Sequence, residues 1–500
     1  GRPDPSPPPV LHALPLPGTM RGASHLAACC FAAAASAAAG LRTAARGAGA
    51  GPAYYWPHAR GNVGHYSMAE YTAPTNLTAA LSWSWHHPDG QYHTVVVSAP
   101  LLDDKRNVYI SSEDGVRKFS RNGKQLWYHA TSPDPLAYGI SLMDGLVFGT
   151  SMSGSVFALD MRTGKARWSE RLAFRNPSDT GYTEAHNGVV IAGLDSGNGG
   201  GATRVLGLEA KSGRRLWEYK SPVQLWNFMP VFPDDESFVV MDIHGGVLRH
   251  SLHNGTLLWK TEPPKVSADS FSDGGVMIGP DGTSYTCSNY QGSGQHGELG
   301  ALRAYGLEDG RLLWERKLEY PCNSWPVITR DGGSVIVPSG AFVMSPSAQY
   351  QELQKAFNKS QRGMQEFSLS LGDKELRTYG LPDRTAAIRA FDAHTGVPQW
   401  STELPPYGRL AARGDEEGYL ERQQLKHRNQ CLPAQFGAPT ISADGTIYVG
   451  RADGLLYAVE SGTGRFRTFD AKAGFLHPGT SWAPGMMAVT TCDGLFVWNY

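Results

Sequence analysis

The sequence contains few charged residues, and the two signs are balanced. Charged side chains make up 18% of the 500 residues, with 45 Lys and Arg against 46 Asp and Glu. Nucleic acids and anionic membrane surfaces attract basic patches, so this balance argues against nucleic acid or an anionic surface as a partner. The chain also lacks an apolar run of about 20 residues, the length of a membrane-spanning helix, so no membrane span is predicted.

The first 52 residues lack the pattern of a folded domain. Residues 1–19 are rich in proline, which predicts disorder. Met20 and Arg21 precede an alanine-rich run with an Ala-Ser-Ala cleavage pattern, which predicts a signal peptide at about residues 20–45. The absence of acidic residues from Pro5 to Ala69 also suits an organelle transit peptide. We therefore expect a protein of the secretory pathway, secreted or lumenal, with an organelle as the alternative.

Cysteine is scarce. The chain has six, of which Cys29 and Cys30 fall in the predicted leader. The other four allow three different disulfide pairings in an oxidising compartment, and the sequence does not choose among them by spacing alone.

Glycine and tryptophan, in contrast, are abundant and recur together. A turn glycine is followed four residues later by a tryptophan at Trp127, Trp168, Trp217, Trp259, Trp314 and Trp400. Successive tryptophans lie 41, 49, 42, 55 and 86 residues apart. A period of about forty residues, stretched by insertions, is typical of a radial repeat fold. Each repeat is then a small sheet that buries its faces against its neighbours.

The tryptophans have a structural explanation. A large ring on the outer strand can pack on the next sheet while its N–H finds a partner, so all six are predicted docking residues. A small residue stands six positions before the turn glycine, as at Ala158 and Gly207, and leaves room for the ring. A seventh repeat keeps the turn at Gly464 and places Thr468 where the tryptophan is expected. Asp160, four residues before its turn glycine, is predicted to bond the turn backbone.

Two stretches carry a family resemblance: Ala-Leu-Asp-Met-Arg-Thr-Gly-Lys-Ala-Arg-Trp at 158–168 and Ala-Phe-Asp-Ala-His-Thr-Gly-Val-Pro-Gln-Trp at 390–400. They resemble the tryptophan-docking repeat of the pyrroloquinoline-quinone (PQQ)-like β-propellers. Trp-Pro-His-Ala-Arg-Gly-Asn at 56–62 is similar to the opening found ahead of the first blade in that family. The resemblance covers about residues 54–500. It implies an all-β fold of eight four-stranded antiparallel blades, and it is compatible with both quinoprotein dehydrogenases and non-catalytic scaffolds.

The predicted organisation follows from the repeat count. Residues 53–500 form one propeller, with helical insertions at about 345–383 and 404–435 in blades six and seven. The last repeat stops without its outer strand, and residues 81–85 near the N-terminus supply a candidate for it. We therefore predict that strands from both termini close the ring, because closure removes the last open edges.

The loops before the first strand of each blade predict a binding surface. They carry aromatic and amide side chains that converge on one mouth of the channel, as a flat ligand or a peptide requires. The candidate residues are Tyr138, Tyr182, Glu184, Trp226, Asn227, Asn323, Trp325, Gln435 and Trp482. Packing of the rim is the competing interpretation. Cys322 and Cys431 stand at corresponding places before blades six and seven, so a Cys322–Cys431 disulfide is the pairing we favour.

The sequence favours a non-catalytic binding or scaffold module for a protein or small ligand, with no cofactor. The alternative is a PQQ-dependent alcohol or sugar dehydrogenase, which needs Ca²⁺ and an acidic base beside the quinone. Many such enzymes also carry adjacent bonded cysteines, and the adjacent pair here is Cys29-Cys30 in the leader. No catalytic residue is assigned. His86, His87 and His93 show no ligand spacing that completes a metal site, so none is predicted.

Overall fold

The computed structural model describes residues 54–63, 67–136, 138–174, 182–195, 202–225, 228–264, 275–290, 299–340, 359, 386–407, 412–415, 431, 436–475 and 479–500. All of them belong to the unit that spans residues 49–500. The predicted leader and most of both predicted insertions, 345–383 and 404–435, lie outside the described residues.

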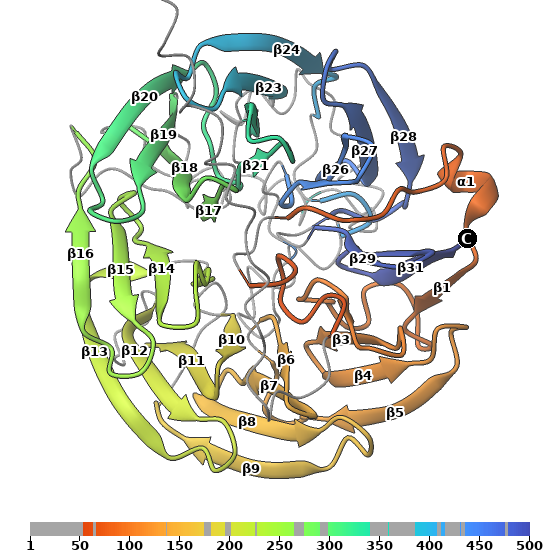
Figure 1. Ribbon diagram of the computed structural model, residues 1–500. Helices are drawn as coiled ribbons and strands as arrows, with labels where there is room; N and C mark the ends of the chain where they lie inside the picture. The colour runs from red at the N-terminus through yellow and green to blue at the C-terminus, as the bar shows by residue number, and fades with distance from the viewer. Residues whose placement is uncertain are drawn as a thin grey trace, which may run out of the picture. The chain divides into compact units, whose positions relative to one another are not determined.

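Eight antiparallel sheets, here called blades, follow one another around a ring (Figure 1). In blades one to seven the strands pair in chain order, from the strand nearest the axis to the outermost. The predicted eight-bladed all-β propeller is confirmed.

Blades one to four follow the N-terminal residues. Blade one contains β2 (Leu101–Leu102), β3 (Val108–Ser112), β4 (Gly115–Phe119) and β5 (Gln125–Ala130). Blade two contains β6 (Ser141–Met143), β7 (Leu146–Thr150), β8 (Ser155–Asp160) and β9 (Ala166–Arg171). Blade three contains β10 (Thr183–His186), β11 (Val189–Leu194), β12 (Ala202–Glu209) and β13 (Arg215–Leu225). Blade four contains β14 (Ser237–Met241), β15 (Val247–Ser251) and β16 (Leu257–Thr261), and the single bridge Val231–Val239 stands in place of its innermost strand.

Blades five to eight complete the ring. Blade five contains β17 (Val276–Ile278), β18 (Thr283–Asn289), β19 (Gly300–Gly306) and β20 (Leu312–Leu318). Blade six contains β21 (Val327–Ile328), β22 (Ser334–Gly340), β23 (Ala386–Asp392) and β24 (Pro398–Leu404). Blade seven contains β25 (Thr440–Ile441), β26 (Thr446–Gly450), β27 (Leu455–Glu460) and β28 (Phe466–Asp470). Blade eight contains β29 (Ser481–Ala483), β30 (Met486–Thr490), β31 (Gly494–Asn499) and β1 (Trp83–His86).

Strand composition matches strand position in the ring. The second strand of blade three, β11, is Val-Val-Ile-Ala-Gly-Leu, and all six residues are buried because blades cover both of its faces. The outer strand β9, Ala-Arg-Trp-Ser-Glu-Arg, is mostly exposed. In these two blades an apolar run marks the middle of the sheet, and a polar, exposed strand marks the circumference.

All six predicted docking tryptophans bond the next blade. Each indole Nε1–H donates to a backbone carbonyl oxygen at the start of the following blade's outer turn. The bonds are Trp127 to Met161 at 3.0 Å, Trp168 to Ala210, Trp217 to Leu252, Trp259 to Leu307 and Trp314 to Ala393 at 2.9 Å, and Trp400 to Ser461 at 2.6 Å. The turn aspartate behaves as predicted, since Asp160 Oδ1 accepts the backbone N–H of Thr163 at 2.8 Å.

Each docking ring lies directly on a turn glycine. A Cβ atom added to Gly213 would stand 2.7 Å from the Trp168 ring, and φ there is +74°. A docking ring needs space within its own blade as well, because a Cβ on Gly207 would stand 2.1 Å from the ring of Trp217. A bulge beside each of the six tryptophans shifts the strand register. The glycine–tryptophan spacing is therefore a packing rule.

Blade seven departs from the predicted register. Arg467, and not Thr468, stands opposite Ala458, and no bulge interrupts that pair of strands. The assignment of Thr468 to the docking position is wrong. The reason is physical: the bulge accommodates a docking ring, and β28 has none.

Ring closure by both termini is confirmed. Strand β1 pairs antiparallel with β31, with Trp83 opposite Val497 and Trp85 opposite Leu495. Trp83 also acts as a seventh docking residue, because its Nε1–H donates to the Arg121 carbonyl oxygen of blade one at 2.8 Å. One turn of helix, α1 (Leu77–Ala80), precedes β1 and is capped by the Asn76 side chain.

Candidate functional site

The ring has two chemically different ends. At one end, here called the turn end, each innermost strand finishes and the docking turn joins the two outer strands of blades one to seven. At the connection end, each outer strand leads into the next blade. Residues 54–71 meet the turn end, apart from 64–66, which lie outside the described residues (Figure 1). Their backbone contacts are Trp56 with Leu102, Pro57 with Leu142 and Ala69 with Ile441, from blades one, two and seven.

The opening motif reaches into the axial core. Arg60 is fully buried, and its guanidinium carbon lies 4.3 Å from the centroid of the Trp325 ring. His58 Nε2 lies 2.8 Å from the carbonyl oxygen of Ala185 in blade three. Burial lowers the pKa of His58 to about 4. The imidazole is therefore neutral at physiological pH, and the segment is held in the ring by buried polar and cation–π contacts.

Glu184 lies beside this motif. The carboxyl group is fully buried, and burial raises its pKa well above the usual value. The Ala59 backbone N–H and the Arg60 charge act in the opposite direction. Glu184 therefore faces a cation of the same chain.

The predicted mouth residues are buried. Tyr138, Tyr182, Trp325 and Trp482 are at most 2% exposed, and Asn323 is 6% exposed. The first three belong to an apolar cluster near the axis, where the Tyr138 and Tyr182 ring centroids are 5.6 Å apart. Trp226, Asn227 and Gln435 lie outside the described residues. The structure brings Tyr182, Glu184 and Trp325 together around Arg60, and a binding role for the predicted mouth residues stays a prediction.

The predicted Cys322–Cys431 disulfide is wrong. Cys322 is bonded to Cys287 of β18, and Cys431 is bonded to Cys492, in the turn between β30 and β31. The Cα–Cα distances are 5.4 and 5.7 Å. Corresponding positions in two repeats share a local geometry without being adjacent in space, and proximity decides pairing. One bridge lies between β18 and the connection to blade six, and the other anchors residue 431 to blade eight.

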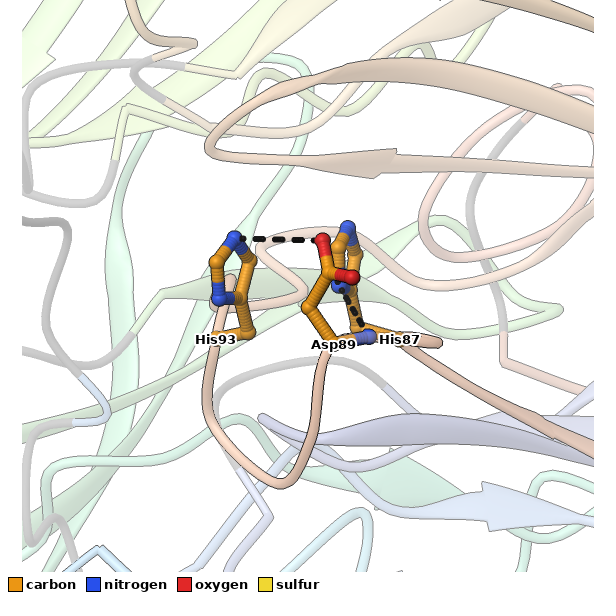
Figure 2. Close-up of side chains that lie close together, drawn as sticks. All are labelled: His87, Asp89 and His93. Atoms are coloured by element: carbon orange, nitrogen blue, oxygen red, sulfur yellow. Dashed lines mark hydrogen bonds and ion pairs between the residues drawn. The ribbon is translucent and has the colours of Figure 1, made fainter.

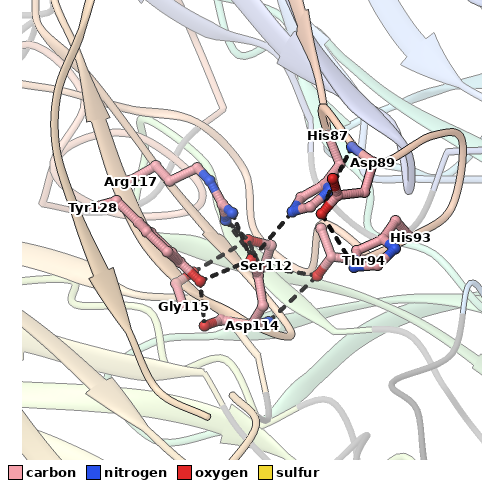
Figure 3. Close-up of polar contacts among 9 residues, drawn as sticks. All are labelled: His87, Asp89, His93, Thr94, Ser112, Asp114, Gly115, Arg117 and Tyr128. Atoms are coloured by element: carbon pink, nitrogen blue, oxygen red, sulfur yellow. Dashed lines mark hydrogen bonds and ion pairs between the residues drawn. The ribbon is translucent and has the colours of Figure 1, made fainter.

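A second polar group lies at the connection end, where blade eight meets blade one (Figure 3). It surrounds an open cavity of about 660 Å³ lined by residues that include Trp85, His87, His93 and Arg117. The Arg117 guanidinium carbon lies 4.9 Å from the Trp85 centroid and 4.1 Å from that of Tyr128. This cavity was not predicted, because its residues come from separate repeats.

Asp114 is the electrostatic centre of this group. Its carboxylate accepts hydrogen bonds from Arg117 at 2.8 Å, Ser112 at 2.7 Å and Tyr128 at 2.9 Å. Burial alone would raise the pKa of Asp114, but these bonds outweigh burial and hold the pKa below its usual range. The carboxylate is therefore ionised, and its oxygens face His87 as well as Arg117.

The sequence comparisons match this architecture. A family model described as outer membrane protein assembly factor BamB matches residues 85–193 and 181–327. The outer membrane protein assembly factor BamB of Xanthomonas campestris pv. campestris is 22% identical over 342 residues, covering 64% of this chain and 80% of that relative.

Solved structures with the same fold include enzymes. A quinohemoprotein alcohol dehydrogenase from Pseudomonas putida HK5 has a TM-score of 0.57 at 13% identity, covering 90% of this chain and 80% of its own. A europium-containing methanol dehydrogenase has a TM-score of 0.58 at 13% identity, covering 90% and 98%.

At 13% identity the solved structures establish the fold alone. The family model, in contrast, matches the sequence of the repeats between residues 85 and 327. The matched repeats, the tryptophan docking and the ring of eight blades agree, and the predicted resemblance to the PQQ-like repeat β-propellers is confirmed.

Proposed function

We propose that the protein is a non-catalytic scaffold that binds another protein at the connection end of the ring. The observation that carries the proposal is a buried cluster that joins the N-terminal segment to the loops before blades two, three, four and six. Ala59, Tyr138, Tyr182, Met229 and Trp325 belong to one buried apolar cluster, to which the N-terminal segment contributes. Close packing makes this part of the ring rigid and keeps these aromatic side chains from a substrate in solution.

The mouth residues that the structure describes argue against a quinone cofactor. A flat quinone needs an exposed aromatic face, and the Arg60 guanidinium covers a face of the Trp325 ring. Ca²⁺ needs several oxygen ligands, and the one carboxyl group predicted at the mouth, Glu184, is buried beside Arg60. Both disulfides join cysteines that are distant in sequence, 35 and 61 residues apart, so neither is the adjacent pair found in many quinoproteins.

The similar proteins named above also favour a non-catalytic scaffold. The family model and the Xanthomonas relative are both named as an outer membrane protein assembly factor, which is a protein-assembly role. By analogy we infer a protein partner and a compartment reached through the secretory pathway. In the described part of the chain, no helix is long and apolar enough to cross a bilayer. The quinoprotein dehydrogenase is the competing function, because enzymes with this fold are among the structural neighbours.

Site-specific photocrosslinking tests the binding end. Phe174 is 82% exposed and follows β9 at the connection end, whereas the exposed Arg162 lies in the docking turn of the same blade at the turn end. A benzophenone side chain introduced at position 174 should form a discrete crosslinked product with a protein of the native compartment, and one at 162 should not. Equal labelling at both positions, or none at 174, would argue against the proposed surface.

Reconstitution tests the competing function. We expect that addition of PQQ and Ca²⁺ produces no bound-quinone absorption after gel filtration and no dye-linked alcohol oxidation. A stoichiometric quinone spectrum with turnover would replace the scaffold proposal by a dehydrogenase. These measurements are independent of the crosslinking result.

A further inference from the structure

The loop that follows the closing strand β1 brings together two imidazoles and a carboxylate (Figure 2). His87, Asp89 and His93 each offer one ligand atom, and the three atoms lie within 4.8 Å of one another. Asp89 Oδ2 is 3.7 Å from His87 Nδ1 and 3.7 Å from His93 Nε2. The two rings are stacked with centroids 4.5 Å apart and an interplanar angle of 16°, so one ring must turn before both in-plane nitrogen lone pairs point at a single ion.

These separations are close to those of a metal coordination shell. Zinc binds imidazole nitrogen and carboxylate oxygen at about 2.0–2.2 Å, which places tetrahedral ligand atoms about 3.4 Å apart. The two observed distances of 3.7 Å exceed this by a few tenths of an ångström. Asp89 and His93 have 66% and 53% exposed side chains, so both can rotate. Rotation of His93 out of the ring stack would bring its nitrogen to ligand distance and shorten its separation from the His87 nitrogen, which is at most 4.8 Å.

A second carboxylate supports the buried member of the set. His87 has a 9% exposed side chain, and its Nε2 lies 3.6 Å from Asp114 Oδ2. If Nε2 carries the proton toward Asp114, Nδ1 carries none. In the structure Nδ1 accepts the Asp89 backbone N–H at 3.2 Å, and an ion bound at Nδ1 would replace that hydrogen bond. Metal-binding histidines commonly direct their other ring nitrogen to a carboxylate in this way. Asp114 is itself held by Arg117, Ser112 and Thr94, so it can orient His87 from outside the ligand set (Figure 3).

We propose that His87, Asp89 and His93 form a binding site for a divalent transition-metal ion of the Zn²⁺ class. Two imidazoles and one carboxylate are a ligand set that such ions accept, and the open cavity of about 660 Å³ leaves further positions for water or a ligand. The sequence prediction of no metal site overlooked Asp89, which lies between the two histidines.

The position of the site gives it a structural consequence. The loop joins β1, the outer strand of blade eight, to residues 95–97, which enter blade one. The ion would therefore hold the connection between the closing strand and the first blade. Binding to the folded chain alone would stabilise the closed ring by mass action.

Competition for Zn²⁺ against a chromophoric chelator, on the full chain without an affinity tag, tests the site. The matched control is His253→Gln, because His253 is 43% exposed and lies 3.6 Å from Glu236 without a second histidine in its ion pair. We expect one zinc ion per chain in the wild type and in His253→Gln. His93→Gln and Asp89→Asn should each bind at least tenfold more weakly, with circular dichroism spectra like that of the wild type.

Two further readouts make the result decisive. Zn²⁺ should raise the melting temperature of the wild type and of His253→Gln, and should raise it less for His93→Gln. Co²⁺ should give visible absorption typical of a site with nitrogen ligands, which the His93→Gln change removes. The proposed site would be overturned if His93→Gln and Asp89→Asn bound zinc as tightly as the wild type. It would also be overturned if His253→Gln lost as much affinity as they do, because zinc would then bind surface histidines without a defined site.

Discussion

The interface between blades seven and eight differs from the interfaces that tryptophan docking builds. Around most of the ring, an indole packs on the turn glycine of the next blade and bonds its turn backbone. Blade eight has no such outer turn, because its two outer strands come from opposite ends of the chain. In its place, Trp498 of β31 donates to the Leu77 carbonyl oxygen of α1 at 2.7 Å, and Phe469 packs on Trp498 with centroids 5.1 Å apart.

The different neighbour explains why blade seven needs no docking tryptophan. A docking ring is useful only where a hairpin turn receives it, and β28 faces α1 and Trp498 instead. The departure from the repeat is therefore a result of closing a ring with two termini. The predictions below test how unequal the two kinds of interface are.

The largest effect is expected from removing the closing strand. Deletion of residues 53–90 removes β1, α1 and Trp83, which leaves β31 with an unpaired edge and blade one without a docked ring. It also removes the N-terminal segment that contacts blades one, two and seven. We expect loss of cooperative thermal unfolding, measured by circular dichroism. A chain that starts at residue 53 is the control and should melt normally. A native melting temperature in the deletion would show that closure is dispensable.

Truncation of a docking ring should cost about 3–5 kcal/mol of unfolding free energy, the usual range for a large buried aromatic. Trp314→Ala and Trp168→Ala are the variants, and each loses a bond to the next blade at 2.9 Å. Trp83→Ala should cost a similar amount, because that ring makes the same contact from the closing strand. Urea denaturation measures all three, and a much smaller cost at Trp83 would separate the closing blade from the others.

Loss of either disulfide should cost about 2–5 kcal/mol. The Cys431–Cys492 bridge spans 61 residues and anchors to the closing blade, and Cys287–Cys322 spans 35. The loop-entropy model predicts that the longer bridge contributes slightly more, by about 0.5 kcal/mol. Denaturation of Cys492→Ser and Cys287→Ser measures both. A reversed order would indicate that native contacts outweigh loop length.

The docking contact itself can be isolated by two glycine substitutions. Gly213 and Gly188 have φ of +74° and +80°, so alanine strains the backbone at both. An added Cβ meets the Trp168 ring 2.7 Å away at Gly213 and nothing within 4 Å at Gly188. We expect Gly213→Ala to cost about 1–3 kcal/mol more than Gly188→Ala, the range for overpacking. Equal costs would mean that the ring moves aside freely.

The smallest effect is expected at Thr468→Ala. Thr468 lies in β28 opposite Tyr457, and its blade has no docking ring to lose. The change should stay below about 0.5 kcal/mol, as for most surface positions. A cost comparable with that of Trp168→Ala, in the same denaturation assay, would show that this position carries the blade interface after all.

Sequence alone predicted the parts of this protein that repeat. The glycine–tryptophan spacing predicted six blades and their docking residues, because the same local packing recurs in each. The turn at Gly464, the strands at the two termini and the family resemblance completed the count of eight. The missing outer strand at the C-terminus and the strand-like residues 81–85 were enough to predict closure, since a ring leaves no open edge.

The contacts that depend on one particular place in the ring were decided by the tertiary structure. The correspondence of Cys322 and Cys431 between repeats suggested a bridge, but each lies beside a different cysteine. Trp325 looked like a ligand anchor, yet Arg60, 265 residues earlier, covers it. The proposed metal site depends on the positions of His87 and His93 beside Asp89 and on the contact of His87 with Asp114 of blade one. A repeat fixes what every blade shares, and only the closed ring determines which distant residues meet.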